Sequence, residues 1–89
     1  MDPNQENAMT ILKAMVEGSR RRGNGDVIKM LTNLSFEEIN NAVPCLEDMG
    51  LVQTLRGRKK IRYEFFNVTL APAGYQYYND NFGKIKAIE

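Results

Sequence analysis

Apolar residues recur at spacings of three and four along the first part of the chain, which predicts an amphipathic helix over residues 5–17. Its apolar face comprises Ala8, Ile11, Leu12, Met15 and Val16. Gly18 is expected to end this helix, because glycine adopts the left-handed conformation without a steric cost. The segment that follows, residues 19–25 (SRRRGNG), has the composition of a loop.

A short second helix is predicted after this loop. Asp26 is placed to cap its first turn, and the apolar pattern ends near Asn33. The apolar positions of this helix are Val27, Ile28, Met30 and Leu31.

A third helix is predicted from Ser35 to Met49, with its stop at Gly50. Ser35 and Glu38 have the spacing of a capping box, which satisfies backbone N–H groups at a helix start. One face is apolar, with further small or apolar residues on its flank: Phe36, Ile39, Val43 and Leu46, flanked by Ala42, Cys45 and Met49. The opposite face is polar apart from one proline: Glu37, Asn41, Pro44 and Asp48.

Pro44 is an unusual residue inside a helix. It has no N–H to donate to the carbonyl of Asn40, a loss that costs about 3 kcal/mol in a regular helix. We therefore expect a kink, or a break into two short helices around Val43.

The period of the pattern changes after Gly50. Residues 51–55 (LVQTL) and 61–68 (IRYEFFNV) have the composition of strands. RGRKK (56–60) between them is predicted to be a hairpin loop, with Gly57 available for a positive φ. Alternation along the second strand places Tyr63 and Phe65 on one face and Phe66 on the other.

Pro72 suits the first position of a fourth helix, whose face would hold Tyr75 and Tyr78. The tail beyond it is expected to add a short turn packed by Phe82, Ile85 and Ile88. The predicted fold is therefore α+β and mainly α. Three helices, a two-stranded β-hairpin wing and a C-terminal helix indicate a winged helix-turn-helix.

The length of 89 residues predicts one domain that spans residues 1–89. A chain this short buries a modest core, so we expect a homodimer, with the first helix and the C-terminal segment as its surfaces. No run of about 18 apolar residues is present, and the N-terminus lacks the pattern of a signal peptide. A single cysteine, Cys45, suits a reducing cytoplasm.

The chain contains no histidine. That excludes a zinc finger of the usual Cys and His ligands and removes the commonest general base. No nucleophile–base pair and no glycine-rich phosphate loop is found. The sequence therefore predicts neither an enzyme nor a protein with a metal or cofactor.

Charged residues are segregated along the chain, although the formal net charge is only +1. Residues 56–62 hold five basic residues in seven positions: Arg56, Arg58, Lys59, Lys60 and Arg62. The third helix holds acidic residues and no basic one: Glu37, Glu38, Glu47 and Asp48. A second basic run lies in the loop after the first helix: Arg20, Arg21 and Arg22.

The segments ILKAMVEG, FEEINNAVPCLEDMGLV and LAPAGYQYY, with a basic hairpin before the last of them, resemble small prokaryotic winged helix-turn-helix DNA-binding proteins. The similarity covers roughly residues 8 to 80. It implies that the third helix docks in the major groove of double-stranded DNA, while the wing touches the backbone or minor groove. The implied contacts from the third helix are Asn40, Asn41 and Pro44. The implied wing contacts are Arg56, Arg58, Lys59, Lys60 and Arg62.

Two functions fit these features. The first is a DNA-binding transcriptional regulator in which the basic wing supplies most of the affinity. Arg20, Arg21 and Arg22 would then add a second backbone contact, or else form a solvated loop or pair with the acidic third helix. The alternative is a winged helix that binds another protein through its acidic third helix, residues 35–49.

Overall fold

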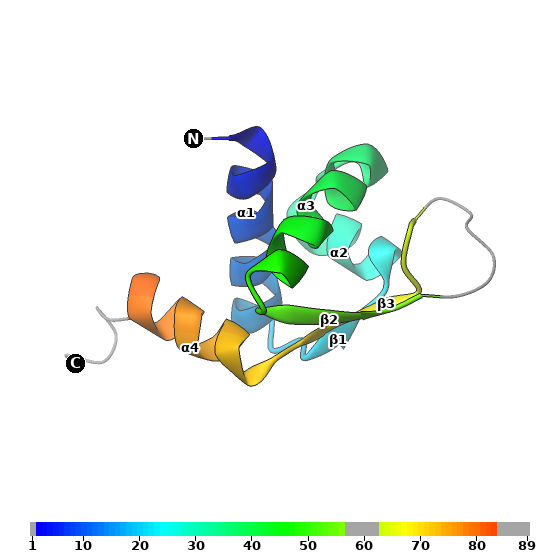
Figure 1. Cartoon of the computed structure of the whole chain (residues 1–89). Helices are drawn as coiled ribbons and strands as arrows, with labels where there is room; N and C mark the ends of the chain where they lie inside the picture. The colour runs from blue at the N-terminus through cyan, green and yellow to red at the C-terminus, as the bar shows by residue number, and fades with distance from the viewer. Residues whose placement is uncertain (1, 57–62, 84–89) are drawn as a thin grey trace.

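The computed structural model describes residues 2–56 and 63–83, and within them the chain forms helices and one antiparallel sheet (Figure 1). The elements in chain order are α1 (Pro3–Glu17), β1 (Arg22–Gly23), α2 (Gly25–Thr32), α3 (Phe36–Asp48), β2 (Val52–Leu55), β3 (Asn67–Leu70) and α4 (Pro72–Asn81). Several predicted features lie outside the described residues. They are Gly57, Arg58, Lys59 and Lys60 of the predicted hairpin loop, Arg62 of the predicted second strand, and the turn predicted around Ile85 and Ile88. The mainly helical α+β class is confirmed.

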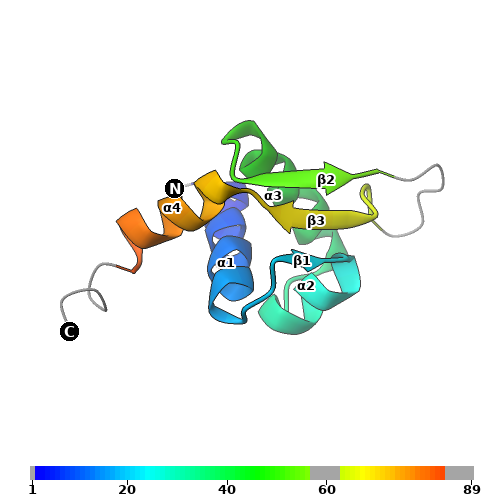
Figure 2. The ribbon, with the colours of Figure 1, turned by 90° about the horizontal axis from the view of Figure 1, so that it is seen from below.

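Helices α1, α2 and α3 lie together on one side of the sheet, and α4 extends away from one end of it (Figures 1 and 2). Helix α1 contacts each of the other three helices, so its apolar face forms the centre of the core. The largest fully buried side chains are Ile11, Leu12, Met15, Ile28, Ile39, Val43, Leu46 and Val68. None of the described helices is both long enough and apolar enough to cross a membrane.

The sheet has the strand order β1–β3–β2, and both pairings are antiparallel. Strand β1 lies inside the segment 19–25 that was predicted to be a loop, so that prediction is wrong at Arg22 and Gly23. These two residues become a strand because β3 presents a second edge to them, with the Leu70 N–H donating to the Arg21 carbonyl at 2.7 Å. The second strand of the predicted hairpin also begins later than expected, at Asn67 instead of residue 61.

Local backbone chemistry sets the ends of the helices. Ser35 accepts from the Glu38 N–H at 3.1 Å and Glu38 accepts from the Ser35 N–H at 2.9 Å, which confirms the capping box. The cap of α2 is Asn24, whose side chain accepts from the Val27 N–H at 2.9 Å, and not Asp26 as predicted. Helix α1 ends at Gly18, but the left-handed residue is Ser19, with φ 58°.

Helix α3 continues through Pro44 as one α-helix, so the predicted break around Val43 does not occur. Pro44 is exposed, while the opposite side of the helix is buried along the contact with α1. That buried side spans both halves of the helix, from Ile39 to Leu46, so packing holds both halves in one helix. The tertiary contact therefore outweighs the local cost of the proline.

Four apolar side chains expected in the core or on an interior face are exposed. Their exposed fractions are 68% for Met30, 46% for Phe36, 40% for Met49 and 38% for Tyr75. Phe36 is the first residue of α3 and Met49 is its C-cap, so both lie at the ends of the helix. In α4 the buried positions are Gly74 and Tyr78, one turn apart, because the Gly74 backbone lies against the Leu51 carbonyl.

Aromatic and polar contacts join α4 to α1. The Tyr78 hydroxyl donates to the Glu17 carboxylate at 2.8 Å, and the Phe82 ring lies 5.8 Å from the Tyr78 ring. The Lys13 ammonium lies over Phe82, 5.1 Å from its ring centre. Parts of α1 and of the C-terminal segment, the two surfaces expected to form a dimer, are therefore used within one chain.

Tyr78 gives stability a pH dependence that can be measured. The hydrogen bond to Glu17, burial and the negative charge of Glu17 raise the pKa of Tyr78 above its ordinary value of 10.0. The folded state therefore holds this proton more tightly than the unfolded chain, and the resulting stability is fully present below about pH 10 and lost as pH rises through the folded pKa. We expect the difference in the free energy of unfolding between wild type and Tyr78→Phe to narrow from about pH 8 to about pH 11. Urea unfolding measures this difference at each pH. A difference that stays constant across this range would show that the pKa of Tyr78 is not raised in the folded state.

Replacing Pro44 tests whether packing alone carries α3 through this residue. Pro44→Ala is expected to raise the free energy of unfolding by up to about 3 kcal/mol, because alanine restores the N–H and removes the ring clash. Asn41→Ala, on the same exposed face, is the control and is expected to change it by no more than about 0.7 kcal/mol. Urea denaturation at neutral pH measures both, and a Pro44→Ala protein no more stable than the control would show that the helix carries no strain here.

Candidate nucleic-acid interface

The surface of α3 divides into three stripes that follow the helical period. The first stripe is buried and packs mainly on α1: Ile39, Ala42, Val43 and Leu46. Because this stripe fixes how α3 is rotated about its axis, it also decides where every other side chain of the helix lies. The remaining two stripes contain the residues predicted to face DNA.

The second stripe faces the segment that joins β2 to β3, residues 56–66, which we call the connection. Asn40 and Glu47 are seven residues apart and so lie on the same side of α3. The Asn40 side-chain oxygen accepts from the Glu64 N–H at 2.9 Å. Glu47 forms an ion pair with Arg56 at 2.7 Å and accepts a hydrogen bond from the Thr54 hydroxyl. Both ends of the connection are thus bonded to α3.

The two ends of the connection are also bonded to each other. The Arg56 guanidinium donates to the Glu64 carbonyl at 2.8 Å, and the Phe66 N–H donates to the Leu55 carbonyl at 2.6 Å. The ion pair of Arg56 and Glu47 is partly solvated, with 49% and 27% of the side chains exposed, so the pair itself is worth less than about 1 kcal/mol. The positions of Arg56 and of residues 63–66 therefore depend on the whole set of bonds.

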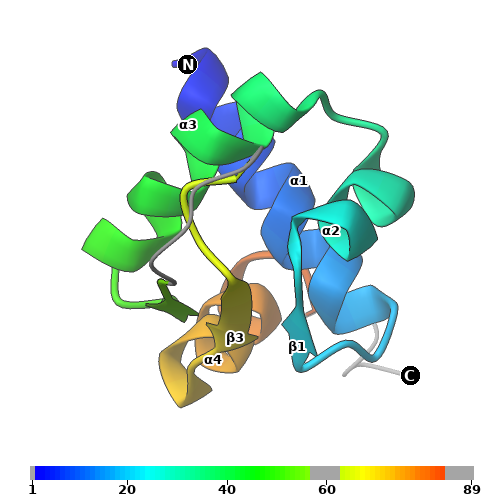
Figure 3. The same ribbon diagram turned by 90° about the vertical axis from the view of Figure 1, so that its right-hand side faces the viewer.

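Tyr63 anchors the returning half of the connection on α2. Its ring covers Gly25, its hydroxyl lies 3.4 Å from the Asp26 carboxylate, and its ring centre is 5.6 Å from that of Phe65. Figure 3 shows this part of the connection rising from β3 toward the helices. Phe65 is buried and Phe66 is 62% exposed, so the predicted separation of these rings is confirmed, although the segment is not a strand.

The third stripe is the outer face of α3: Glu37, Asn41, Pro44 and Asp48. All four side chains are exposed, as the sequence predicted. Within residues 2–56 and 63–83, the side chains of Glu37, Asn41 and Asp48 form no hydrogen bond or ion pair. The outer face adjoins the second stripe, in which Glu47 binds Arg56. The unbonded polar side chains of the outer face therefore lie next to the first residue of the basic segment.

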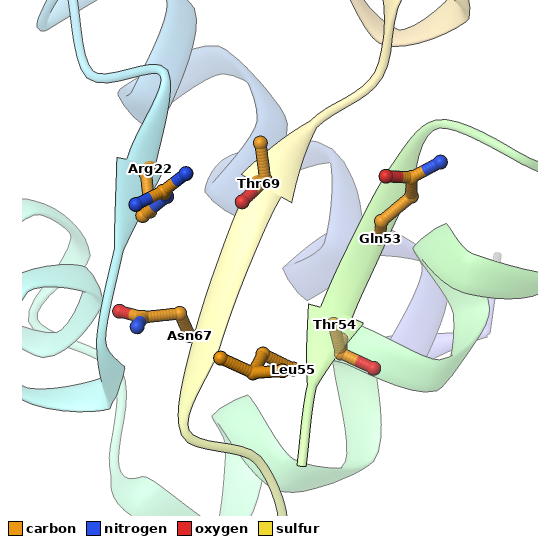
Figure 4. A pocket seen from close by; sticks show the side chains of 6 residues that line it. All are labelled: Arg22, Gln53, Thr54, Leu55, Asn67 and Thr69. Atoms are coloured by element: carbon orange, nitrogen blue, oxygen red, sulfur yellow. The ribbon is translucent and has the colours of Figure 1, made fainter.

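The arginines of the second basic run lie elsewhere. The Arg22 side chain lies on the face of the sheet turned away from the helices, beside a hollow of about 300 Å³ (Figure 4). The other residues that line the hollow are Gln53, Thr54, Leu55, Asn67 and Thr69. Arg21 pairs with Leu70 at the end of the sheet next to α4, whereas Arg56 leaves the opposite end of the sheet. Arg20, Arg21 and Arg22 are exposed and form no ion pair with any described residue.

The structure therefore separates the predicted contact residues into groups. Asn41 and Pro44 are exposed on the outer face, whereas the side-chain oxygen of Asn40 is engaged by Glu64. Arg56 is held in the ion pair with Glu47, and Arg58, Lys59, Lys60 and Arg62 lie outside the described residues.

Sequence reasoning missed the residues that fix the connection: Gly25, Glu47, Thr54, Tyr63 and Glu64. The seven-residue spacing of Asn40 and Glu47 is the one signal that pointed to a shared side of α3.

Among the described residues, no three His, Cys, Asp or Glu side chains are grouped so as to hold a metal ion. No protein-family model, curated protein or solved structure matches the chain. The outer face of α3 can form hydrogen bonds with a ligand. It lies next to Arg56 and Glu64, the described residues on either side of the basic stretch, which are both bonded to α3.

A methyl group at Gly25 tests the anchoring of the connection. A β-carbon there would overlap the Tyr63 ring, so Gly25→Ala is expected to lower the free energy of unfolding by about 1 to 3 kcal/mol. In a Tyr63→Ala background the same substitution should cost less than about 0.5 kcal/mol, because the overlap is gone and alanine favours the helix. A double-mutant cycle in urea measures the coupling, and equal costs in the two backgrounds would show that Tyr63 does not cover Gly25.

Proposed function

We propose that this chain is a winged helix-turn-helix protein that binds double-stranded DNA and regulates transcription in the cytoplasm. In this proposal the connection is the wing and α3 is the helix that enters the major groove. The order of three helices, a β2–β3 hairpin and a fourth helix supports it, together with the sequence resemblance. β1 adds a third strand to the two-stranded hairpin that the sequence pattern predicted.

One observation carries the proposal: Arg56 and Glu64, which lie on either side of Arg58, Lys59, Lys60 and Arg62 in the sequence, are both bonded to α3. Arg56 and Glu64 bracket the segment, and their partners Glu47 and Asn40 lie on one side of α3. Because Arg56 and Glu64 are held beside α3, the chain leaves and returns next to the outer face, which allows the basic residues and the outer face to contact one duplex. Fixing these two ends reduces the entropy lost on binding, and the basic residues supply attraction to phosphates.

The acidic residues of α3 oppose DNA binding less than the sequence suggests. Glu47 is paired with Arg56, and Glu38 accepts the Ser35 N–H at the start of the helix. Only Glu37 and Asp48 then remain as unpaired carboxylates on α3 within the described part of the chain. Arg56 is correspondingly assigned to positioning the wing, and phosphate contact is assigned to Arg58, Lys59, Lys60 and Arg62.

A protein-binding module is the second candidate, and the exposed apolar residues of α3 favour it. Phe36 and Met49 are 46% and 40% exposed at opposite ends of the helix, near the unpaired carboxylates Glu37 and Asp48. An acidic helix with apolar ends suits a basic, partly apolar partner surface. A stable protein complex that is lost on charge reversal at Glu37 and Asp48 would support this candidate.

Salt dependence of DNA binding distinguishes the two candidates. For wild type, the logarithm of the association constant for a mixed-sequence duplex should fall with the logarithm of salt concentration by about 0.9 per phosphate neutralised. Arg58→Ala/Lys59→Ala/Lys60→Ala should bind more weakly and lower this slope by up to about 2.7, since three cations are removed. Fluorescence anisotropy with a labelled duplex measures both values.

The matched comparison is Arg20→Ala/Arg21→Ala/Arg22→Ala, which removes the same charge from the other end of the sheet. We expect its slope to stay closer to the wild-type value. Absence of binding at low salt would refute the proposal, and so would a wing variant with the same slope and affinity as wild type.

A further inference from the structure

We infer that the outer face of α3 recognises cytosine through Glu37, adenine through Asn41 and a thymine methyl group through Pro44, and that Asn40 takes no part in recognition. This inference rests on the proposed DNA binding and specifies what the bound duplex must contain. It follows from the division of α3 into residues with internal partners and residues without them.

Internal hydrogen bonds remove half of the polar candidates on α3. Glu38 is bonded in the capping box, Asn40 to the Glu64 N–H, and Glu47 to Arg56 and Thr54. A side chain that left such a bond to contact a base would give up one interaction to gain another. Within residues 2–56 and 63–83, Glu37, Asn41 and Asp48 have no such bond to give up.

The spacing of the outer face suits a row of base pairs. Glu37 and Asn41 are four residues apart, so their β-carbons lie about 6 Å from each other on the surface of α3. Base pairs stack about 3.4 Å apart along DNA, so two contacts at this distance reach bases one or two pairs apart. Pro44 lies one further turn along the same face, beyond Asn41.

The chemistry of each side chain selects a base edge. An ionised Glu37 carboxylate only accepts hydrogen bonds. In the major groove cytosine presents the N4 amino donor alone, whereas guanine presents only acceptors and adenine places the acceptor N7 beside its N6 donor, where it repels a carboxylate. The Asn41 amide both donates and accepts, which matches N7 and N6 of adenine. Pro44 has no N–H and presents an apolar ring, which suits the thymine methyl group.

Asp48 lies outside this set because of its position. It is eleven residues beyond Glu37 on α3, or about 16 Å along the helix axis. The major groove is about 12 Å wide, so a helix whose first half lies in the groove places Asp48 near a phosphate. Its charge then weakens binding equally for all sequences, which makes Asp48→Ala a useful control.

The test is selection of bound duplexes from a pool with a randomised central region, using the full chain at low salt and sequencing the retained DNA. Wild type should enrich a cytosine and an adenine one or two positions apart. Asn41→Ala should reduce the preference for adenine by roughly 5- to 100-fold and Glu37→Gln the preference for cytosine by a similar factor, the range expected for one base contact. Thermal melting of each variant checks that it is folded.

The controls are the neighbouring residues with other assignments. Asn40→Ala should leave the enriched sequence unchanged while lowering the melting temperature, and Asp48→Ala should raise affinity without changing the sequence. Retention of duplexes with no enriched sequence would overturn the inference and leave DNA binding intact. So would an Asn41→Ala protein with wild-type preference, or loss of the adenine preference in Asn40→Ala. Failure of wild type to retain any duplex would instead refute the proposed function itself.

Discussion

The packing of α3 on α1 is the interaction on which the rest of the structure depends. Ile39, Val43 and Leu46 are almost completely buried against a helix that also contacts α2 and α4. This contact keeps α3 continuous through Pro44 and fixes its rotation about its own axis. One side of α3 must then face the connection, and another must face outward. The arrangement of polar residues on the exposed sides of α3 is thus a consequence of apolar burial.

Charge in this chain is balanced at short range as well as in total. The sequence shows acidic residues on the third helix and basic residues after it, which suggests two opposing surfaces. In the structure the nearest members of the two groups, Glu47 and Arg56, neutralise each other where the connection leaves the sheet. Segregation along the sequence therefore provides the contact that holds Arg56, the first residue of the basic segment, beside α3.

Elements with a strong apolar period were predicted well, and those that depend on distant pairing were not. α1, α3 and α4 each carry their own pattern and start signals, such as the Ser35–Glu38 capping box and Pro72. β1 has two residues with no strand signal, and it exists because β3 offers a free edge. The start of β3 at Asn67 likewise depends on Tyr63 and Phe65 packing onto the helices.

The candidate site was predictable only in outline. The exposed face of α3 follows from helical period, so Asn41 and Pro44 were placed correctly on the surface. Asn40 differs from Asn41 by one position, or about 100° of rotation, and an apolar pattern locates a face no more finely than that. Its bond to Glu64 spans 24 residues and leaves no local signal.

The two adjacent asparagines carry a consequence for how this chain can change over evolutionary time. Substitution of Asn40 removes the acceptor for the backbone N–H of residue 64. That N–H is present whatever the side chain at residue 64, so it needs a partner in every sequence with this connection. The Asn41 side chain has no hydrogen bond to preserve within the described residues. Related chains can therefore diversify at residue 41 while residue 40 stays the same. Asn40 is then retained because the fold needs its bond, whereas residue 41 varies with whatever contacts the outer face of α3.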